Sequence, residues 1–258
     1  MVKLRRVSQP RICLITGAGR GIGREVAVRL AGAGYRVALT ARSKDELTET
    51  LSLCGGSGVV VPADITADGA VDSIFERVEA ELGPVEVLVA NAGIAVSAPL
   101  ARITDEEWQR VLDVNLTAPF RCVRRAVPAM VGGSWGRIVV IGSLASRVGK
   151  PYIAAYAASK HGVLGLVRAA AAELAKTGVT VNAVCPAYVD TPMTDDSVRN
   201  IAAKTGRPEA EARRILEGQQ PSGRLITAAE VAAAVLFCVE NGAINGQGIN
   251  VDGGAVQS

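Results

Sequence analysis

The feature that most constrains the fold is a regular alternation of short apolar runs and amphipathic stretches along the whole chain. Amphipathic stretches such as GREVAVRLAGAG and DSIFERVEAELG separate most of the apolar runs. Strands that alternate with helices predict βαβ units and a parallel sheet covered on both faces. Right-handed crossovers then give a doubly wound α/β fold. The predicted strands, about seven, are residues 11–17, 36–42, 58–66, 85–93, 137–143, 180–186 and 247–254.

The length and composition fit one large α/β domain, which we expect to span residues 1–258. Hydrophobic residues make up 49% of the chain and aromatic residues only 3%, so Ala, Val, Leu and Ile must fill the core. One polar, charged segment, residues 191–224, interrupts the alternation between the last two strands. A long insertion after a strand's carboxyl end predicts a cover over the substrate site, and an extra pair of surface helices fits equally well.

Charge and cysteine usage exclude several classes of protein. The net charge is 28 − 25 = +3, which predicts neither a nucleic-acid nor a membrane partner. No apolar run reaches the length of a membrane span or follows the basic start as in a signal peptide. The five cysteines include no CxxC pair, which indicates reduced thiols rather than a metal site. We therefore expect a cytoplasmic protein without a metal.

The stretch TGAGRGIG, residues 16–23, follows the first predicted strand and opens the first predicted helix. Its glycines fall where a strand turns tightly, where backbone approaches a phosphate, and where helix and strand pack closely. The helix N-terminus would then face a pyrophosphate. A purely structural glycine-rich turn is the alternative. The predicted dinucleotide contacts in this loop are Gly17, Gly19, Arg20, Gly21, Ile22 and Gly23.

The end of the second predicted strand indicates which dinucleotide is used. Proteins of this fold that bind NAD usually place Asp or Glu there for the ribose 2′-hydroxyl. This chain has Ala41 and then Arg42, and a guanidinium can donate two hydrogen bonds to a 2′-phosphate. Arg20 could add a second positive charge. The sequence therefore predicts NADP(H) as the cofactor, the alternative being two solvated surface arginines.

Seven motifs in register resemble those of the short-chain dehydrogenase/reductases. They are the TGxxxGxG loop, Asp64 after the third strand, ANAG at 90–93, VNL with Asn115, Ser143, YAASK with Tyr156 and Lys160, and PAYVDTPM at 186–193. They run in order over nearly the whole chain. The resemblance implies a Rossmann-type fold and an NADP(H)-dependent oxidoreductase that interconverts a ketone and a secondary alcohol.

The resemblance also implies roles for residues around the cofactor. Asp64, with Ile65 beside it, would bond the adenine amine. Asn91 and Gly93 would form the wall under the adenine ribose. The nicotinamide carboxamide would contact Pro186, Val189 and Thr191. The chain departs from the family pattern at Ala187, where glycine usually follows the proline, and the added methyl group could narrow the space near the nicotinamide.

The stretch YIAAYAASK holds two tyrosines that could form an acid–base pair with Lys160. The family's serine precedes its catalytic tyrosine by about a dozen residues, and Ser143 precedes Tyr156 by 13. Lys160 follows Tyr156 by one helical turn, whereas on the same helix Tyr152 would lie two turns away. Tyr156 is therefore the expected proton donor, with its pKa lowered by Lys160. Ser143 would hydrogen-bond the substrate oxygen, and Asn115, by family analogy, would position a relay water.

The substrate is less well determined. The general pattern is similar to 3-oxoacyl-thioester reductases, which implies a 3-oxoacyl or 3-hydroxyacyl thioester. A free aryl, cyclic or polyketide ketone is the alternative, as is a non-catalytic NADP(H)-sensing regulator. Arg147 could meet an anionic end of the substrate or could be solvated. The resemblance further implies a homotetramer. The predicted pocket residues are Ile94, Val96, Leu144, Ala145, Tyr152, Tyr188 and Met193.

Overall fold

A single parallel sheet of seven strands runs through the computed structural model, which describes residues 10–257. The predicted domain also includes residues 1–9 and 258, which lie outside this range. The strand order is β3-β2-β1-β4-β5-β6-β7, and all six neighbouring pairs are parallel. The predicted doubly wound α/β fold is therefore confirmed. The strands are β1 Ile12–Thr16, β2 Arg36–Ala41, β3 Gly58–Pro62, β4 Val87–Ala90, β5 Gly136–Ile141, β6 Val179–Pro186 and β7 Gly248–Val251.

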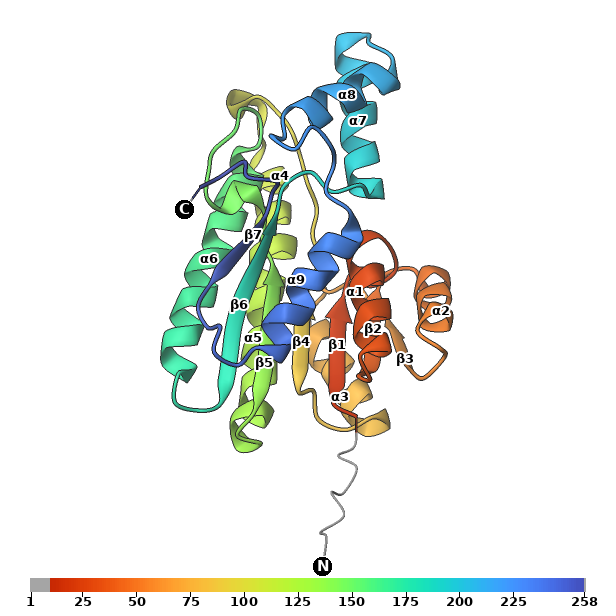
Figure 1. Ribbon diagram of the computed structural model, residues 1–258, viewed down its shortest axis with the longest axis vertical. Helices are drawn as coiled ribbons and strands as arrows, with labels where there is room; N and C mark the ends of the chain where they lie inside the picture. The colour runs from red at the N-terminus through yellow and green to blue at the C-terminus, as the bar shows by residue number, and fades with distance from the viewer. Residues whose placement is uncertain (1–9, 258) are drawn as a thin grey trace, which may run out of the picture.

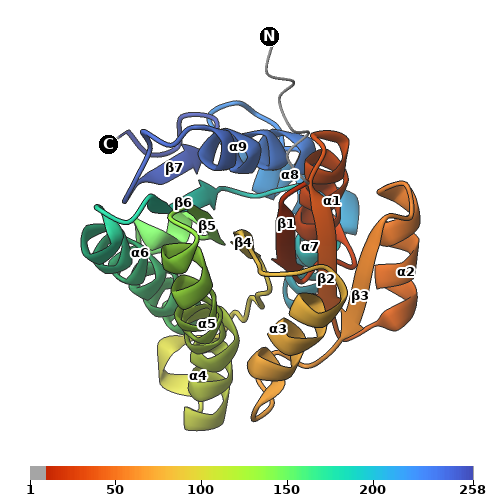
Figure 2. The same cartoon turned by 90° about the horizontal axis from the view of Figure 1, so that it is seen from below.

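Helices cover both faces of this sheet (Figures 1 and 2). Helices α1, α2 and α9 pack on one face, over a core that includes Leu30, Leu47 and Val235. Helices α3, α5 and α6 pack on the other face, over a core that includes Phe75 and Val167. The helices are α1 Gly21–Gly32, α2 Lys44–Leu53, α3 Ala70–Glu81, α4 Asp105–Leu112, α5 Ala118–Gly132, α6 Ala154–Leu174, α7 Pro192–Thr205, α8 Glu209–Gly218 and α9 Ala228–Glu240.

The sheet order places a topological switch between β1 and β4. The chain moves outward from β1 to β2 and β3, then returns across the sheet to β4 on the other side of β1. In open parallel sheets, ligands bind in the crevice outside the carboxyl ends of the strands at such a point. The loop before α1 begins there, at the end of β1. The topology thus indicates where a dinucleotide would lie.

The polar insertion at 191–224 contains helices α7 and α8, joined by a short connection. They extend beyond the carboxyl end of the sheet (Figure 1). The pair has a small apolar core of its own, made by Val198, Ala212, Leu216 and Leu225. Tyr188, which follows β6, packs against this core. The insertion is therefore a helix pair, tied to the strand end through Tyr188.

The helices of residues 10–257 include none with the combination of length and apolar character needed to cross a bilayer.

Candidate active site

A cleft of about 720 Å³ opens at the carboxyl ends of β1, β2 and β4. It extends from the start of α2 to the start of α7, so segments distant in the sequence form its walls. Eleven of the predicted cofactor residues line it: Gly17, Gly19, Arg20, Gly21, Ile22, Arg42, Asp64, Ile65, Asn91, Gly93 and Thr191. The structure therefore brings together most of the residues that the sequence assigns to a dinucleotide.

The glycine loop has a backbone that other residues could not adopt. Gly17 has φ +65°, and a methyl group there would lie 2.9 Å from both Ala92 Cα and Asn91 Nδ2. At Gly23 a methyl group would lie 2.2 Å from the carbonyl oxygen of Gly17. These separations are shorter than real carbon contacts, so glycine is required at both positions. Gly23 does not line the cleft, and its role is packing.

Asn91 holds the glycine loop against the end of β4. Its Nδ2 donates to the carbonyl oxygens of Thr16 and Gly17, at 2.9 and 3.0 Å. The backbone N–H groups of Asn91 and Ala92 both donate to Thr16 Oγ1, at 3.0 Å each. Asn91 thus joins β1 to β4 in addition to facing the cleft.

The first turn of α1 is suited to an anion. The residue before it, Arg20, makes no side-chain cap, and the turn contains no acidic residue. Uncapped N–H groups at a helix N-terminus carry partial positive charge and bind phosphate groups. Together with the close backbone approach at Gly17, this turn fits the pyrophosphate of a dinucleotide.

The outer end of the cleft carries positive charge. Arg20 and Arg42 both line it and both are exposed, and neither has an ion-pair partner within residues 10–257. Asp64 also lies at this end, and its Oδ1 accepts from the N–H and the hydroxyl of Thr66, at 2.9 and 2.6 Å. These hydrogen bonds, and to a smaller extent Arg42, lower the pKa of the Asp64 carboxyl. An ionised Asp64 is thereby favoured, as an acceptor for an amine would require.

Ser143 lies two residues after the end of β5, in an extended conformation that starts a single 3-10 turn, η3 Leu144–Ser146. Its Oγ accepts from the N–H of Ala145 at 3.1 Å, and its own N–H donates to Ser146 Oγ at 3.1 Å. The acceptor bond uses an oxygen lone pair and leaves the hydroxyl hydrogen for another acceptor. Ser143 is therefore a fixed donor at the strand end.

Tyr156 and Lys160 lie one turn apart on α6 and face Ser143 and the end of β5. Lys160 is 5% exposed, and its Nζ donates to the carbonyl oxygen of Ile141 at 2.8 Å. The same Nζ lies 5.7 Å from the centre of the Tyr156 ring. A methyl group at Gly93 would lie 3.7 Å from Lys160 Nζ, which places the ammonium beside the inner wall of the cleft.

Burial shifts the protonation of both groups. It raises the pKa of the Tyr156 phenol above its ordinary value, although a hydrogen bond with Ser143 lowers it in part. Burial also lowers the pKa of the Lys160 ammonium to about 8. The sequence led us to expect a Tyr156 pKa lowered by Lys160. In this structure the net shift has the opposite direction, because burial has the larger effect and Lys160 bonds to Ile141.

Asn115 is fully buried in a π-helical turn, η2 Asp113–Thr117, between α4 and α5. Its Oδ1 accepts from the N–H of Ile94, and its Nδ2 donates to the Ile94 carbonyl oxygen, both at 2.9 Å. Nδ2 also donates to Ser159 Oγ at 3.1 Å, and that hydroxyl donates to the Tyr156 carbonyl oxygen at 2.7 Å. Asn115 therefore connects the loop after β4 to the helix that carries Tyr156.

The structure corrects the expected position of one side chain and adds a contact to another. Tyr152 does not belong to the helix of Tyr156, because α6 begins at Ala154. Its φ is +69° and its side chain is 63% exposed, so it lies in a turn, and its contact with the substrate stays a prediction. Arg147 donates to the carbonyl oxygen of Gly248 at 2.5 Å and is partly buried against β7. Its guanidinium is thus partly held by β7, and contact with an anionic end of the substrate stays a prediction.

The other predicted substrate and nicotinamide residues divide into three groups. Ile94 and Met193 line the cleft. Leu144 and Ala145 are buried in η3, directly after Ser143. The rest do not line the cleft: Val96 follows β4, Pro186 ends β6, and Tyr188 and Val189 follow β6.

Several cleft residues escaped the sequence analysis. Ser43 and Glu46 come from the start of α2, where the Ser-x-x-Glu spacing of a helix cap was a visible signal. Asp196, Ser197 and Asn200 come from α7, and their contribution depends on how the helix pair packs. Within residues 10–257 no group of three or more His, Cys, Asp or Glu side chains is placed to hold a metal ion.

Comparison with known proteins shows the family to which the chain belongs. Residues 11–202 match the short chain dehydrogenase family. The chain is 41% identical to the 3-oxoacyl-acyl-carrier-protein reductase MabA of Mycobacterium tuberculosis, over 95% of this chain and 92% of the relative. It is 37% identical to the corresponding reductase FabG of Escherichia coli, over 95% of this chain and 96% of the relative. The chain therefore belongs to the short chain dehydrogenase family.

Two solved structures show which kinds of reductase the chain resembles in three dimensions. A single-residue variant of actinorhodin polyketide ketoreductase, solved with NADPH, superposes with a TM-score of 0.92 at 36% identity, covering 95% of this chain and 97% of the other. Levodione reductase superposes with a TM-score of 0.89 at 29% identity, covering 95% and 96%. The protein is an oxidoreductase related to 3-oxoacyl-acyl-carrier-protein reductases and ketoreductases.

Proposed function

We propose that this protein is an NADP(H)-dependent reductase of a 3-oxoacyl thioester or a related ketone, converting the carbonyl to a secondary alcohol. The observation that carries the proposal is the meeting of Ser143, Tyr156 and Lys160 at the carboxyl end of β5. Of the three, Lys160 reaches toward the cleft, since a methyl group at the cleft residue Gly93 would lie 3.7 Å from its Nζ. The likeness to reductases of 3-oxoacyl carrier-protein substrates supports the acyl thioester.

NADP(H) fits the residues at the two ends of the cleft. The uncapped turn of α1 would hold the pyrophosphate, and Arg20 with Arg42 would hold the 2′-phosphate. No carboxylate follows β2 directly to repel that phosphate, since Ala41 and Arg42 occupy the positions there. When bound, the cofactor supplies the hydride that reduces the carbonyl carbon.

The protein's own groups then complete the reaction. Ser143 redirects its hydroxyl hydrogen from Tyr156 to the substrate oxygen, where negative charge develops as the carbonyl is reduced. Tyr156 transfers its phenolic proton to that oxygen, and the raised pKa that burial gives the phenol keeps it protonated beforehand. Lys160 uses one N–H on Ile141 and has two remaining for ribose hydroxyls and for the phenolate left behind.

A second candidate substrate is a free aryl, cyclic or polyketide ketone, favoured by the close superposition on a polyketide ketoreductase. The reaction at Tyr156 is the same for both. The homotetramer, the single domain over residues 1–258, the cytoplasmic location and the covering role of residues 191–224 stay predictions.

The test is the consumption of NADPH by the wild-type protein with acetoacetyl-CoA, with NADH in parallel. We expect turnover with NADPH to exceed turnover with NADH. Tight NADPH binding without turnover would reject the acyl thioester and point to the second candidate. Failure to bind NADPH would contradict the proposed cofactor.

A further inference from the structure

A carboxylate stands among the arginines at the outer end of the cleft. Glu46 is the third residue of α2, three positions after the N-cap residue Ser43. This spacing usually forms a reciprocal cap, in which the glutamate carboxylate accepts from the N–H of the cap residue. Only half of that cap is made, because Ser43 Oγ accepts from the Glu46 N–H at 3.3 Å. The Glu46 carboxylate is therefore available for another role.

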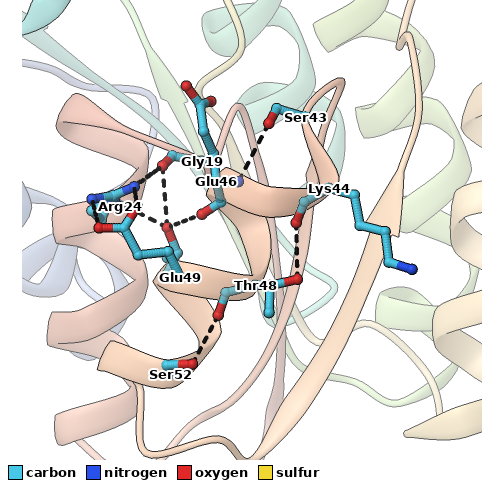
Figure 3. A network of polar contacts seen from close by, with 9 residues as sticks. Gly19, Arg24, Ser43, Lys44, Glu46, Thr48, Glu49 and Ser52 are labelled. Carbon is cyan, nitrogen blue, oxygen red and sulfur yellow. Dashed lines mark hydrogen bonds and ion pairs between the residues drawn. The ribbon is translucent and has the colours of Figure 1, made fainter.

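The Glu46 side chain lies against the glycine loop. A methyl group at Gly19 would lie 2.8 Å from Glu46 Oε2 and 2.9 Å from its Cβ. Glu46 also lines the cleft together with Arg20, Arg42 and Ser43. Within residues 10–257 its carboxylate has no hydrogen-bond or ion-pair partner, and in Figure 3 it extends away from the neighbouring polar network.

Glu49, the next acidic residue on α2, differs from Glu46 because its carboxylate has a partner (Figure 3). One turn later on α2, the Glu49 carboxylate oxygens accept two hydrogen bonds from the Arg24 guanidinium, at 2.9 and 2.8 Å. The same guanidinium holds the Gly19 carbonyl oxygen at 3.0 and 2.6 Å. Arg24 and Glu49 thus neutralise each other and support the loop, whereas the Glu46 carboxylate lines the cleft without an ion-pair partner among residues 10–257.

We propose that Glu46 is a specificity-determining residue that limits the preference for NADP(H) over NAD(H). This inference rests on the proposed binding of NADP(H) at Arg20 and Arg42. A 2′-phosphate placed between these arginines is repelled by the nearby carboxylate, whereas a 2′-hydroxyl can donate a hydrogen bond to it. The preference of the protein for NADP(H) over NAD(H) is therefore weaker than Arg20 and Arg42 alone would produce.

The experiment compares Glu46→Gln with Asp45→Asn, which makes the same charge change one residue earlier. Asp45 is exposed and does not line the cleft. Dissociation constants for NADPH and NADH are measured by cofactor fluorescence at low and high salt, and thermal unfolding verifies that both variants are folded. We expect Glu46→Gln to tighten NADPH binding roughly three- to tenfold at low salt, and less at high salt. NADH binding should stay unchanged or weaken, and Asp45→Asn should match the wild-type protein.

Arg42→Ala separates this inference from the proposed function. If Arg42→Ala weakens NADPH binding but Glu46→Gln does not strengthen it, the role of Glu46 is overturned and NADP(H) binding stands. Equal tightening in Glu46→Gln and Asp45→Asn would also overturn it, since only overall charge would then matter. If the wild-type protein does not bind NADPH, both proposals fail.

Discussion

The glycine loop and the α7–α8 helix pair flank the same cleft but are held in place by different means. The loop is fixed by backbone contacts that exclude any side chain, at Gly17 and Gly23, and by the amide of Asn91. The helix pair is held by a four-residue core and by ion pairs from Arg213. Backbone exclusion leaves a residue pattern visible in the sequence, whereas surface ion pairs do not. The two regions should therefore respond differently to substitution.

The largest effect is expected from Gly23→Ala. The added methyl group would meet the Gly17 carbonyl oxygen at 2.2 Å and Asn91 Nδ2 at 2.5 Å, so the loop must move. We expect a loss of stability of about 2–4 kcal/mol and at least about a hundredfold weaker NADPH binding. Thermal unfolding and fluorescence titration measure the two effects.

Gly32→Ala is the matched control, at the other end of α1. Nothing lies within 4 Å of a methyl group at that position. We expect it to bind NADPH like the wild-type protein and to be slightly more stable, because alanine favours helix. Equal behaviour of the two variants would mean that close packing does not fix the loop.

The next effect concerns pH and Lys160. The pKa of the Lys160 ammonium is about 8 in the folded protein, and the ordinary value of 10.5 applies to the unfolded chain. Between these values the unfolded chain binds a proton that the folded protein does not, so the free energy of unfolding rises with pH. Below pH 8 the proton is bound in both states, and this contribution is constant.

Urea unfolding of the wild-type protein and Lys160→Met at pH 7, 8, 9 and 10 tests this. The other titrating groups are shared, so the difference in unfolding free energy isolates Lys160. That difference should change little from pH 7 to 8 and then shift in favour of the wild-type protein by about 1–3 kcal/mol. A difference that stays constant up to pH 10 would show that burial does not lower the pKa of Lys160.

The smallest effect is expected from Arg213→Ala in α8. Arg213 pairs with Asp190 at 2.7 Å, with Asp195 at 3.3 Å and with Glu217 at 3.4 Å, so it ties the helix pair to the segment after β6. We expect KM for the ketone to rise roughly three- to tenfold with little change in kcat, because the pairs are partly solvated and individually weak.

Arg214→Ala removes the same charge from an exposed neighbour on α8 and is the control in steady-state assays. It should leave KM and kcat as in the wild-type protein. If Arg213→Ala matches it in both parameters, the ion pairs do not position the helix pair.

The fold could be predicted almost entirely from the sequence. All seven strands lie within one residue of the predicted segments, because buried parallel strands are continuous apolar runs between turns. The glycine loop was equally readable, and the resemblance to the short-chain dehydrogenase/reductases singled out Ser143, Tyr156 and Lys160. These features depend on local chain geometry.

The features that the sequence did not reveal concern side chains whose positions depend on distant contacts. Tyr152 was placed on the helix of Tyr156, but the helix starts two residues later, after a turn with a left-handed backbone. Arg147 bonds to Gly248, which is 101 positions away in the chain. Glu46 matched a capping pattern, but packing against Gly19 takes its carboxylate into the cleft. Periodicity does not reveal such contacts.

The most direct test of the account is to follow the hydride itself. NADPH carrying deuterium at both C4 positions is incubated with acetoacetyl-CoA and the wild-type protein, with Tyr156→Phe as the control, and the products are analysed by mass spectrometry. The account predicts one deuterium on the carbon that bears the new hydroxyl group with the wild-type protein. Tyr156→Phe should still bind NADPH but form about a thousandfold less product or none. An unlabelled product, or near-normal turnover by Tyr156→Phe, would contradict it.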